Sequence, residues 1–408
     1  MRALSEAAAS RGHTVTGSDK TTTGHDAKNV HGCDLVVYTN AVPQDNCELA
    51  EARRLGIPVI ERASYLGELA QTYDTVIAVS GCHGKSTTTA MLGSIFGARK
   101  ATVHAGVAGC SKVGTDKYFV TEACEYRASF LHLHPDVGLV LNVQYDHPDY
   151  YKTEAELVKA YEKFCANCKT VILNGDDKKC DGIAKNARTF GLRPGCDYRA
   201  VDITNHNGCR SFKLIGKKQA HVTLSVAGEH NVYNALASIA AADACGLNLT
   251  EILPRLYKFG GIPRRFERRG IAFNKSVFTD YAHHPTEIEA TIKTAKEIFP
   301  SVAVVFQPHT YSRTQSLMDD FAKALACADT VVLAPVFSAR EAPIPGITSH
   351  ALCRQTVKLT ERAYCFDTTT EIIEYCKTLK EKAVIFMGAG DINKTADMFL
   401  AADGLNLL

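Results

Sequence analysis

The sequence predicts an α/β protein made of three α/β units in series, each a mainly parallel sheet covered by helices. Three observations predict this class. Short apolar segments of strand character alternate with helical segments along most of the chain. A Gly-rich turn separates a strand from a helix near residue 80, and the Gly/Pro linker Lys258–Pro263 precedes a further run of alternating elements. The expected domains are 1–72, 73–259 and 260–408.

The composition is that of an ordinary globular protein. Its 408 residues are 46% apolar and 22% charged, which excludes a disordered or collagen-like chain. A net charge of +2 gives no reason to expect a nucleic-acid or membrane-surface partner. No apolar run reaches the roughly 18 residues of a membrane span, and the first residues lack a secretory signal. We expect a cytoplasmic protein, a monomer or weak homodimer, whose 15 scattered cysteines are reduced thiols.

The first domain alternates between helices and strands. The expected elements are a helix at Met1–Gly12, strands at Thr14–Asp19, Leu35–Tyr38 and Pro58–Ile60, and helices at Asn46–Leu55 and Ala63–Ala70. A domain of the dinucleotide-binding type normally opens with a strand and a Gly-rich turn before its first helix. Here the chain begins inside what should be that helix, so we expect a truncated domain.

The strongest sign of chemistry is the turn GCHGKS, from Gly81 to Ser86. It lies between an expected strand at Thr75–Ser80 and an expected helix from about Ser86 to Phe96. The N–H groups of such a turn bind anions, the lysine adds charge for the β- and γ-phosphates, and the serine hydroxyl can ligate Mg²⁺. The strict phosphate-loop motif has glycine where Val79 stands, so the match is partial. The sequence nevertheless predicts a nucleoside triphosphate site.

A carboxylate and an imidazole follow neighbouring strands of this second unit. Glu122 lies in the segment VTEACEYRASFLHL, and His147 follows the expected strand Gly138–Asn142. Ligands of open α/β sheets bind at the carboxyl ends of the strands, so Glu122 and His147 are candidate partners of Ser86 around a metal. Each is weak alone, because an isolated Glu or His is more often structural and because Mg²⁺ prefers oxygen ligands.

The third unit carries two polar segments, DYAHHPTE at Asp280–Glu287 and FQPHTYSR at Phe306–Arg313. Each follows a strand and enters a helix. Together they place more polar side chains at strand ends than packing alone would explain, and this predicts a substrate site. Two other segments are less specific. Asn231 and Asn234 open an Ala-rich helix, where amides either cap the helix or bind a purine edge, and Arg264-Arg265 suits a phosphate or a solvated surface equally well.

With these residues in view, the chain resembles the Mur ligases nearly end to end. The segments that carry the resemblance are GSD, TNAVPQDN, GCHGKSTTT, EACEYRASFLHL, NVQYDHPDYY, GEHNVYNALA, GGIPRRFE, DYAHHPTE, FQPHTYSRT, AREAPIPG and MGAGDI. The resemblance implies a truncated Rossmann-like N-terminal domain for a UDP-sugar, a P-loop ATPase-type central domain and a Rossmann-like C-terminal domain. It implies that ATP, with Mg²⁺, phosphorylates the lactyl carboxylate of UDP-N-acetylmuramate, and that L-alanine then attacks the acyl phosphate, in peptidoglycan precursor synthesis.

The resemblance also implies roles for individual residues. The implied catalytic residues are Lys85, His147, His284 and Arg313. The implied ATP-binding residues are Gly81, Cys82, His83, Gly84, Lys85, Ser86, Thr87, His230, Asn231, Asn234 and Arg265. The implied substrate-binding residues are Ser18, Asp19, Asn40, His283, His284, His309 and Arg313. The implied metal ligands are Ser86, Glu122 and His147.

The chain also departs from the family pattern. The opening Gly-rich turn has no counterpart, Cys82 and Ser86 stand where threonine is usual, and Thr310 stands where many members carry arginine. Two alternatives therefore stay open. One is a ligase that joins a preformed peptide to the same sugar nucleotide, and the other is a catalytically silent nucleotide-binding remnant.

Overall fold

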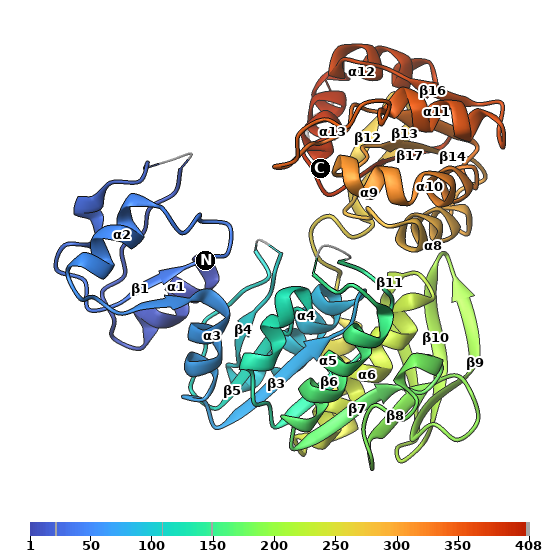
Figure 1. Cartoon of the computed structure of the whole chain (residues 1–408). Helices are drawn as coiled ribbons and strands as arrows, with labels where there is room; N and C mark the ends of the chain where they lie inside the picture. The colour runs from blue at the N-terminus through green and yellow to red at the C-terminus, as the bar shows by residue number, and fades with distance from the viewer. Residues whose placement is uncertain (21–22, 108, 148–149, 405–408) are drawn as a thin grey trace. The chain divides into compact units, whose positions relative to one another are not determined.

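The computed structural model describes residues 1–20, 23–107, 109–147 and 150–404 (Figure 1). It divides into two compact units. The first holds 1–202, 213–222 and 233–259, and the second holds 203–212, 223–232 and 260–408. The described strands form sheets of two, nine and six strands, mostly parallel and alternating with helices along the chain. The expected α/β class is confirmed.

The chain opens with a small two-stranded parallel sheet. Its elements are α1 (Arg2–Ser10), β1 (Val36–Tyr38), α2 (Cys47–Arg54), β2 (Val59–Glu61) and α3 (Arg62–Ala70). Val36 pairs with Val59 in the register of the sheet, and Asn46 caps α2 by accepting from the Glu48 N–H. These elements match the sequence expectations to within a few residues.

The strand expected at Thr14–Asp19 is wrong, because the structure assigns no ladder there. Residues 14–17 are exposed, and Val15 keeps 42% of its surface accessible. A parallel strand depends on a paired neighbour and on burial of its apolar side chains. Neither is present for this segment in the described part of the chain.

The nine-stranded sheet has the order β11-β10-β9-β8-β7-β6-β3-β5-β4. Its strands are β3 (Thr75–Ser80), β4 (Thr102–His104), β5 (Tyr118–Glu122), β6 (Val137–Val140), β7 (Thr170–Asn174), β8 (Arg188–Gly191), β9 (Tyr198–His206), β10 (Cys209–Gly216) and β11 (Ala220–Ala227). The helices between and after them are α4 (Lys85–Phe96), α5 (Glu154–Ala166), α6 (His230–Ala244) and α7 (Leu249–Tyr257).

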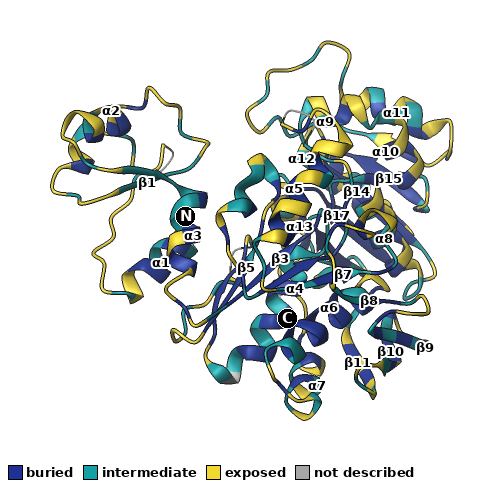
Figure 2. Cartoon of the chain, turned by 60° about the horizontal axis from the view of Figure 1, so that its bottom comes forward, coloured by how far each residue is buried: buried dark blue, intermediate teal, exposed yellow. Residues whose placement is uncertain are grey.

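The strand β3 lies in the middle of this sheet, between the parallel neighbours β5 and β6. Ile77, Ala78 and Val79 are completely buried, as expected of a parallel strand that is covered on both faces. Figure 2 shows the buried colour along such central strands and the exposed colour on the outer face of α5. The Gly-rich turn therefore directly follows a strand that is held in place on both sides.

The six-stranded sheet has the order β12-β13-β17-β14-β15-β16. Its strands are β12 (Glu267–Ala272), β13 (Lys275–Asp280), β14 (Val302–Phe306), β15 (Thr330–Leu333), β16 (Ala363–Cys365) and β17 (Ala383–Met387). Its helices are α8 (Pro285–Lys296), α9 (Tyr311–Ser316), α10 (Met318–Leu325), α11 (Ser349–Val357), α12 (Thr369–Thr378) and α13 (Ile392–Ala401). β12 is antiparallel to β13 and the other pairs are parallel.

Two apolar clusters form the core around the six-stranded sheet. One contains Phe306 and Phe321, and the other contains Phe386 and Phe399. Because successive residues of a strand point to opposite faces, the two clusters cover the two sides of the sheet. Among the described residues, each helix is too short or too polar to traverse a lipid bilayer.

Candidate active site

The turn after β3 has the backbone of an anion-binding loop. Gly81 and Gly84 have φ of +132° and +85°, a region that side chains rarely adopt. A Cβ on Gly84 would also lie 2.7 Å from the Asn234 Oδ1 atom. Helix α4 begins directly after this turn, at Lys85, with Ser86 and Thr87 in its first turn. N–H groups of the turn and of the helix N-terminus are thus available to phosphate oxygens, as the sequence predicts.

Lys85 is held by a buried carboxylate, Glu125. The Lys85 Nζ atom lies 2.9 Å from Glu125 Oε2 and 3.2 Å from the Cys82 carbonyl, and it also donates to the Gly81 carbonyl. Burial by itself lowers the pKa of Lys85, but the negative charge of Glu125 outweighs this effect and raises the pKa above its ordinary value. Phosphate groups that bind in this turn must compete with Glu125 for the lysine.

His147 also approaches Glu125. Its Nε2 atom lies 3.8 Å from Glu125 Oε1, and its ring packs on Tyr126 with 4.6 Å between the ring centres. The Tyr151 hydroxyl donates to the Glu125 carbonyl at 2.6 Å and so fixes the backbone at this residue. The structure therefore brings Lys85, Glu125 and His147 together. Sequence reasoning missed Glu125, although it lies three residues after Glu122 in the same EACE segment.

Glu122 occupies a different position from Glu125. It ends β5, where it pairs with Val79 in the ladder, and its carboxylate accepts from the Gly106 N–H. It therefore lies at the same carboxyl edge of the sheet as the nucleotide turn, bound to backbone. Its role as a metal ligand stays a prediction.

The residues at this edge fit Mg²⁺ in one specific way. Across the described residues, no group of three or more His, Cys, Asp or Glu side chains is arranged to hold a metal. The available donors are the Ser86 hydroxyl, the carboxylates of Glu122 and Glu125, and His147. Mg²⁺ is commonly held by one or two carboxylates together with substrate phosphates and water. The donors therefore suit an ion that arrives with a nucleotide.

The side chains of the turn anchor it to the segment after β6. The Cys82 thiol donates to the Gln144 carbonyl at 2.8 Å and accepts from the Gln144 N–H at 3.1 Å. The His83 Nε2 atom lies 2.7 Å from Gln144 Oε1, and the His83 N–H donates to Asn142 Oδ1. Burial raises the pKa of the Cys82 thiol to about 12. A protonated thiol here acts as a hydrogen-bonding group, as threonine would.

The residues implied for adenine lie in different compact units. Asn234 lies in the first unit, where its Oδ1 atom accepts from the Thr88 hydroxyl at 3.2 Å beside the nucleotide turn. His230 and Asn231 lie in the second unit, and Asn231 donates to the Ala227 carbonyl. Burial lowers the pKa of His230 to about 4. Arg265 is in the second unit as well, 3.3 Å from Glu287. Contacts of these residues with adenine stay predictions.

The two polar segments of the second unit bring imidazoles together. The rings of His283 and His309 are 6.0 Å apart, and His309 stacks on Phe337. Burial lowers the pKa of His283 to about 4 and also lowers that of His309. The nearby Arg313 charge acts in the same direction on both. Within the described part of the chain, the Nδ1 atom of His309 is buried without a hydrogen-bond partner, which suits contact with a ligand.

Two further polar positions of these segments have structural features of their own. His284 is the N-cap of α8, where its Nδ1 atom accepts from the Thr286 N–H. Thr310 has a φ of +66°, unusual for a β-branched residue, and its N–H donates to the Phe337 carbonyl at 2.8 Å. Strain at this position is typical of functional turns.

The candidate residues of the first domain take part in local hydrogen bonds. The Ser18 hydroxyl donates to Glu48 at 2.7 Å, and the Asn40 amide donates to Glu61 at 3.1 Å. The Asp19 N–H and carbonyl form a turn with Thr23 and Gly24. Their substrate contacts stay predictions.

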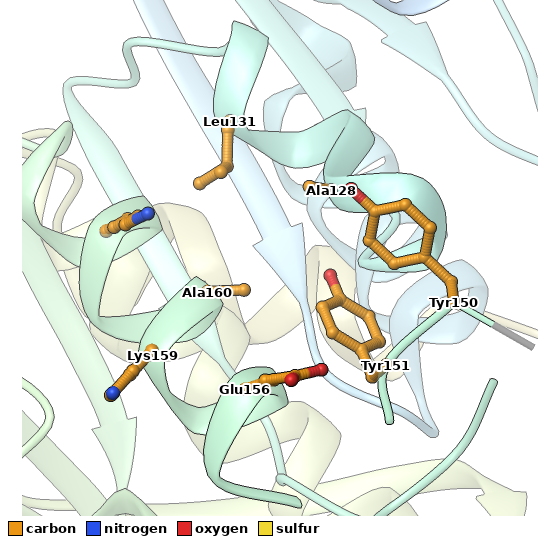
Figure 3. A pocket seen from close by; sticks show the side chains of 8 residues that line it. Ala128, Leu131, Tyr150, Tyr151, Glu156, Lys159 and Ala160 are labelled. Atoms are coloured by element: carbon orange, nitrogen blue, oxygen red, sulfur yellow. The ribbon is translucent and has the colours of Figure 1, made fainter. Parts of the chain in front are cut away.

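A cavity of about 400 Å³ opens between the helix α5 and the segment that contains Tyr150 and Tyr151 (Figure 3). It is lined by Ala128, Leu131, Tyr150, Tyr151, Glu156, Lys159, Ala160 and Lys163. None of these is a residue expected from the sequence to bind substrate. Tyr151, whose hydroxyl holds the Glu125 carbonyl, is the link between the cavity and the Lys85–Glu125 cluster.

Comparison with known proteins gives a consistent result. Residues 79–242 match the family model of the Mur ligase middle domain, 264–390 that of the Mur ligase glutamate ligase domain, and 1–74 that of the Mur ligase catalytic domain. The UDP-N-acetylmuramate–L-alanine ligase of Acetivibrio thermocellus is 40% identical over 98% of this chain and 93% of its own length. That of Caldicellulosiruptor saccharolyticus is 37% identical, over 98% of this chain and 96% of its own.

Solved structures agree with these matches. UDP-N-acetylmuramate-alanine ligase MurC from Thermotoga maritima has a TM-score of 0.80 and 29% identity, covering 97% of this chain and 90% of that one. A murein peptide ligase from Psychrobacter arcticus has a TM-score of 0.68 and 23% identity, covering 100% and 97%, and this second likeness concerns the fold alone. The chain belongs to the Mur ligase family.

Proposed function

We propose that this protein is an ATP-dependent ligase that joins L-alanine to the lactyl carboxylate of UDP-N-acetylmuramate, in the cytoplasmic synthesis of peptidoglycan precursors. The observation that carries the proposal is the cluster of Lys85, Glu125 and His147 at an anion-binding turn. It occurs in a chain 40% identical, over nearly its full length, to a UDP-N-acetylmuramate–L-alanine ligase.

The first step is transfer of the γ-phosphoryl group of ATP to the lactyl carboxylate. The N–H groups of the turn and Lys85 bind the phosphates, so Lys85 exchanges Glu125 for phosphate oxygens. Catalysis then consists mainly of positioning and of neutralising the charge that develops on the transferred group. Mg²⁺ would supply further positive charge at the phosphates. The residues that would hold it are Ser86, His147, the expected Glu122 and, in addition, Glu125.

The second step is attack of the alanine amine on the acyl phosphate, with expulsion of phosphate from the tetrahedral intermediate. Arg313 suits the alanine carboxylate because a guanidinium binds a carboxylate through two parallel hydrogen bonds. The pKa values of His283 and His309 are both lowered, so these partly buried imidazoles are neutral at physiological pH. Alanine attacks as its free amine, and imidazoles with lowered pKa values are weak bases that suit hydrogen bonding to this amine rather than removal of its proton.

The proposal is tested by phosphate release and product mass. The purified chain is incubated with ATP and Mg²⁺, and UDP-N-acetylmuramate and L-alanine are each omitted in turn, with a parallel reaction containing a peptide in place of alanine. We expect phosphate release and a product heavier by one alanine residue only when both substrates are present. Ligation of the peptide but not of alanine would contradict the proposal, as would ATP binding without any release.

A further inference from the structure

Arg62 is a half-buried cation that uses few of its hydrogen-bond donors. It begins α3, directly after β2, and its Nη2 atom lies 3.2 Å from the Nε2 atom of His104. Among the described residues, the guanidinium of Arg62 makes this one hydrogen bond, and no carboxylate forms an ion pair with it. A guanidinium carries five N–H donors and a permanent charge. Most of these donors, and the whole charge, are therefore available to an anion.

His104 fixes the orientation of this guanidinium. Because arginine can only donate, the Nε2 atom of His104 must accept, so its Nδ1 atom carries the proton. Nδ1 lies 3.1 Å from the Thr121 hydroxyl, which in turn donates to the Glu122 carbonyl at 3.0 Å. His104 is only 5% exposed. A buried imidazole with both nitrogens engaged is a rigid support for the arginine.

The position of the pair in the fold is that of a ligand site. Arg62 follows the carboxyl end of β2, His104 ends β4 and Thr121 lies near the end of β5. The carboxyl ends of parallel strands are where open α/β sheets bind ligands. β4 is separated by β5 from β3, which carries the nucleotide turn. At about 4.8 Å per strand, the end of β4 lies about 10 Å along the edge from the end of β3, so Arg62 lies beside the Lys85 turn rather than within it.

We propose that Arg62, positioned by His104, binds an oxyanion of the sugar-nucleotide substrate. The inference rests on the proposed function for the identity of the ligand. Guanidinium binds phosphate and carboxylate alike through paired hydrogen bonds, so the oxyanion is either the diphosphate or the carboxylate of the muramyl group. His104 is a positioning residue, since it touches the arginine and not the ligand.

The test is calorimetric titration of the full chain with UDP, UDP-N-acetylglucosamine and UDP-N-acetylmuramate. We expect Arg62→Gln to weaken binding about tenfold or more, the usual effect of losing a charged hydrogen bond. Weakening of all three ligands places the diphosphate on Arg62, and weakening of UDP-N-acetylmuramate alone places the carboxylate there. ATP affinity should not change. The matched control is Arg54→Gln, at an exposed arginine of α2 paired with Glu51.

The support by His104 is tested with two variants. His104→Leu keeps the arginine but removes its acceptor, and should weaken the same ligands about threefold. His104→Gln should restore them, because an amide can accept from Arg62 and donate to Thr121. If His104 served stability alone, His104→Leu would lower the melting temperature, and ligand affinity would not fall with His104→Leu and return with His104→Gln.

The proposal is overturned if Arg62→Gln stays folded and binds all three ligands as tightly as the parent chain, or if the parent chain binds none of them. A parent chain that binds the sugar nucleotide through Arg62 but does not ligate alanine would contradict the proposed function and leave the anion site standing.

Discussion

The nucleotide turn and the imidazole cluster of the second unit handle charge in opposite ways. At the turn, Lys85 and Glu125 form an ion pair, with the Glu125 side chain only 2% exposed. In the second unit, burial lowers the pKa of His283 to about 4, so its imidazole is neutral near pH 7. At the turn, a phosphate group must replace Glu125 as the partner of Lys85. The imidazole cluster instead offers uncharged hydrogen-bonding groups. One site can act by exchange of charge and the other by hydrogen bonds from uncharged rings.

The largest expected effect is that of removing the lysine. Lys85→Met should lower phosphate release by a factor on the order of 10³, because the phosphates lose their charged partner and the transition state loses a positive group. The measurement is the steady-state rate with both substrates. Lys323→Met, at an exposed lysine of α10, is the matched control and should stay near the parent rate. A Lys85→Met rate within tenfold of the parent would show that the turn does not hold the reacting phosphates.

The second prediction separates the two carboxylates. Glu125→Gln leaves Lys85 buried without its counter-charge, which typically costs about 3–5 kcal/mol of stability. We expect its thermal unfolding temperature to fall more than that of Glu122→Gln, whose carboxylate binds backbone, and ATP should recover part of the loss. Calorimetry with and without ATP measures this. Equal effects of the two substitutions would remove the distinction between these residues.

The sequence predicted the class, most elements of residues 1–96 and the turn, because buried strands and glycines with positive φ leave clear local patterns. It did not predict which acidic residue meets Lys85, since Glu122 and Glu125 are only three residues apart and the choice depends on the bend of the chain after β5. Arg127 and Ala128, with φ of +51° and +53°, form part of this bend without any glycine to mark it. The Arg62–His104 contact joins residues 42 positions apart and has no local signal.

The third prediction concerns pH and the second unit. The pKa of His283 is lowered to about 4 in the folded protein, from about 6.5 in an unfolded chain. Between these values the unfolded state binds more protons, so stability decreases as the pH falls from about 6.5 to 4. Urea unfolding at pH 7 and pH 5 should show this decrease. His283→Asn should make the difference smaller, and an unchanged difference would assign the acid sensitivity to other groups.

The smallest expected effect is at Cys82. Its thiol pKa of about 12 keeps it protonated at pH 7.5, so N-ethylmaleimide should modify the exposed Cys47 and Cys327 first. Cys82→Thr should change the rate less than about threefold, because a hydroxyl can replace the thiol hydrogen bonds to Gln144. Peptide mass mapping after timed labelling measures the order. Early loss of activity together with labelling of Cys82 would contradict the closed geometry of the turn.

The most direct test of the account follows an oxygen atom. UDP-N-acetylmuramate carrying ¹⁸O in its lactyl carboxylate is ligated to L-alanine with unlabelled ATP, and the released phosphate is weighed by mass spectrometry. Formation of an acyl phosphate predicts one ¹⁸O atom in each phosphate released, because the oxygen that joined carbon to phosphorus leaves with the phosphate. Phosphate free of ¹⁸O, released at the rate of ligation, would mean that ATP does not phosphorylate the carboxylate. This result would contradict the proposed chemistry.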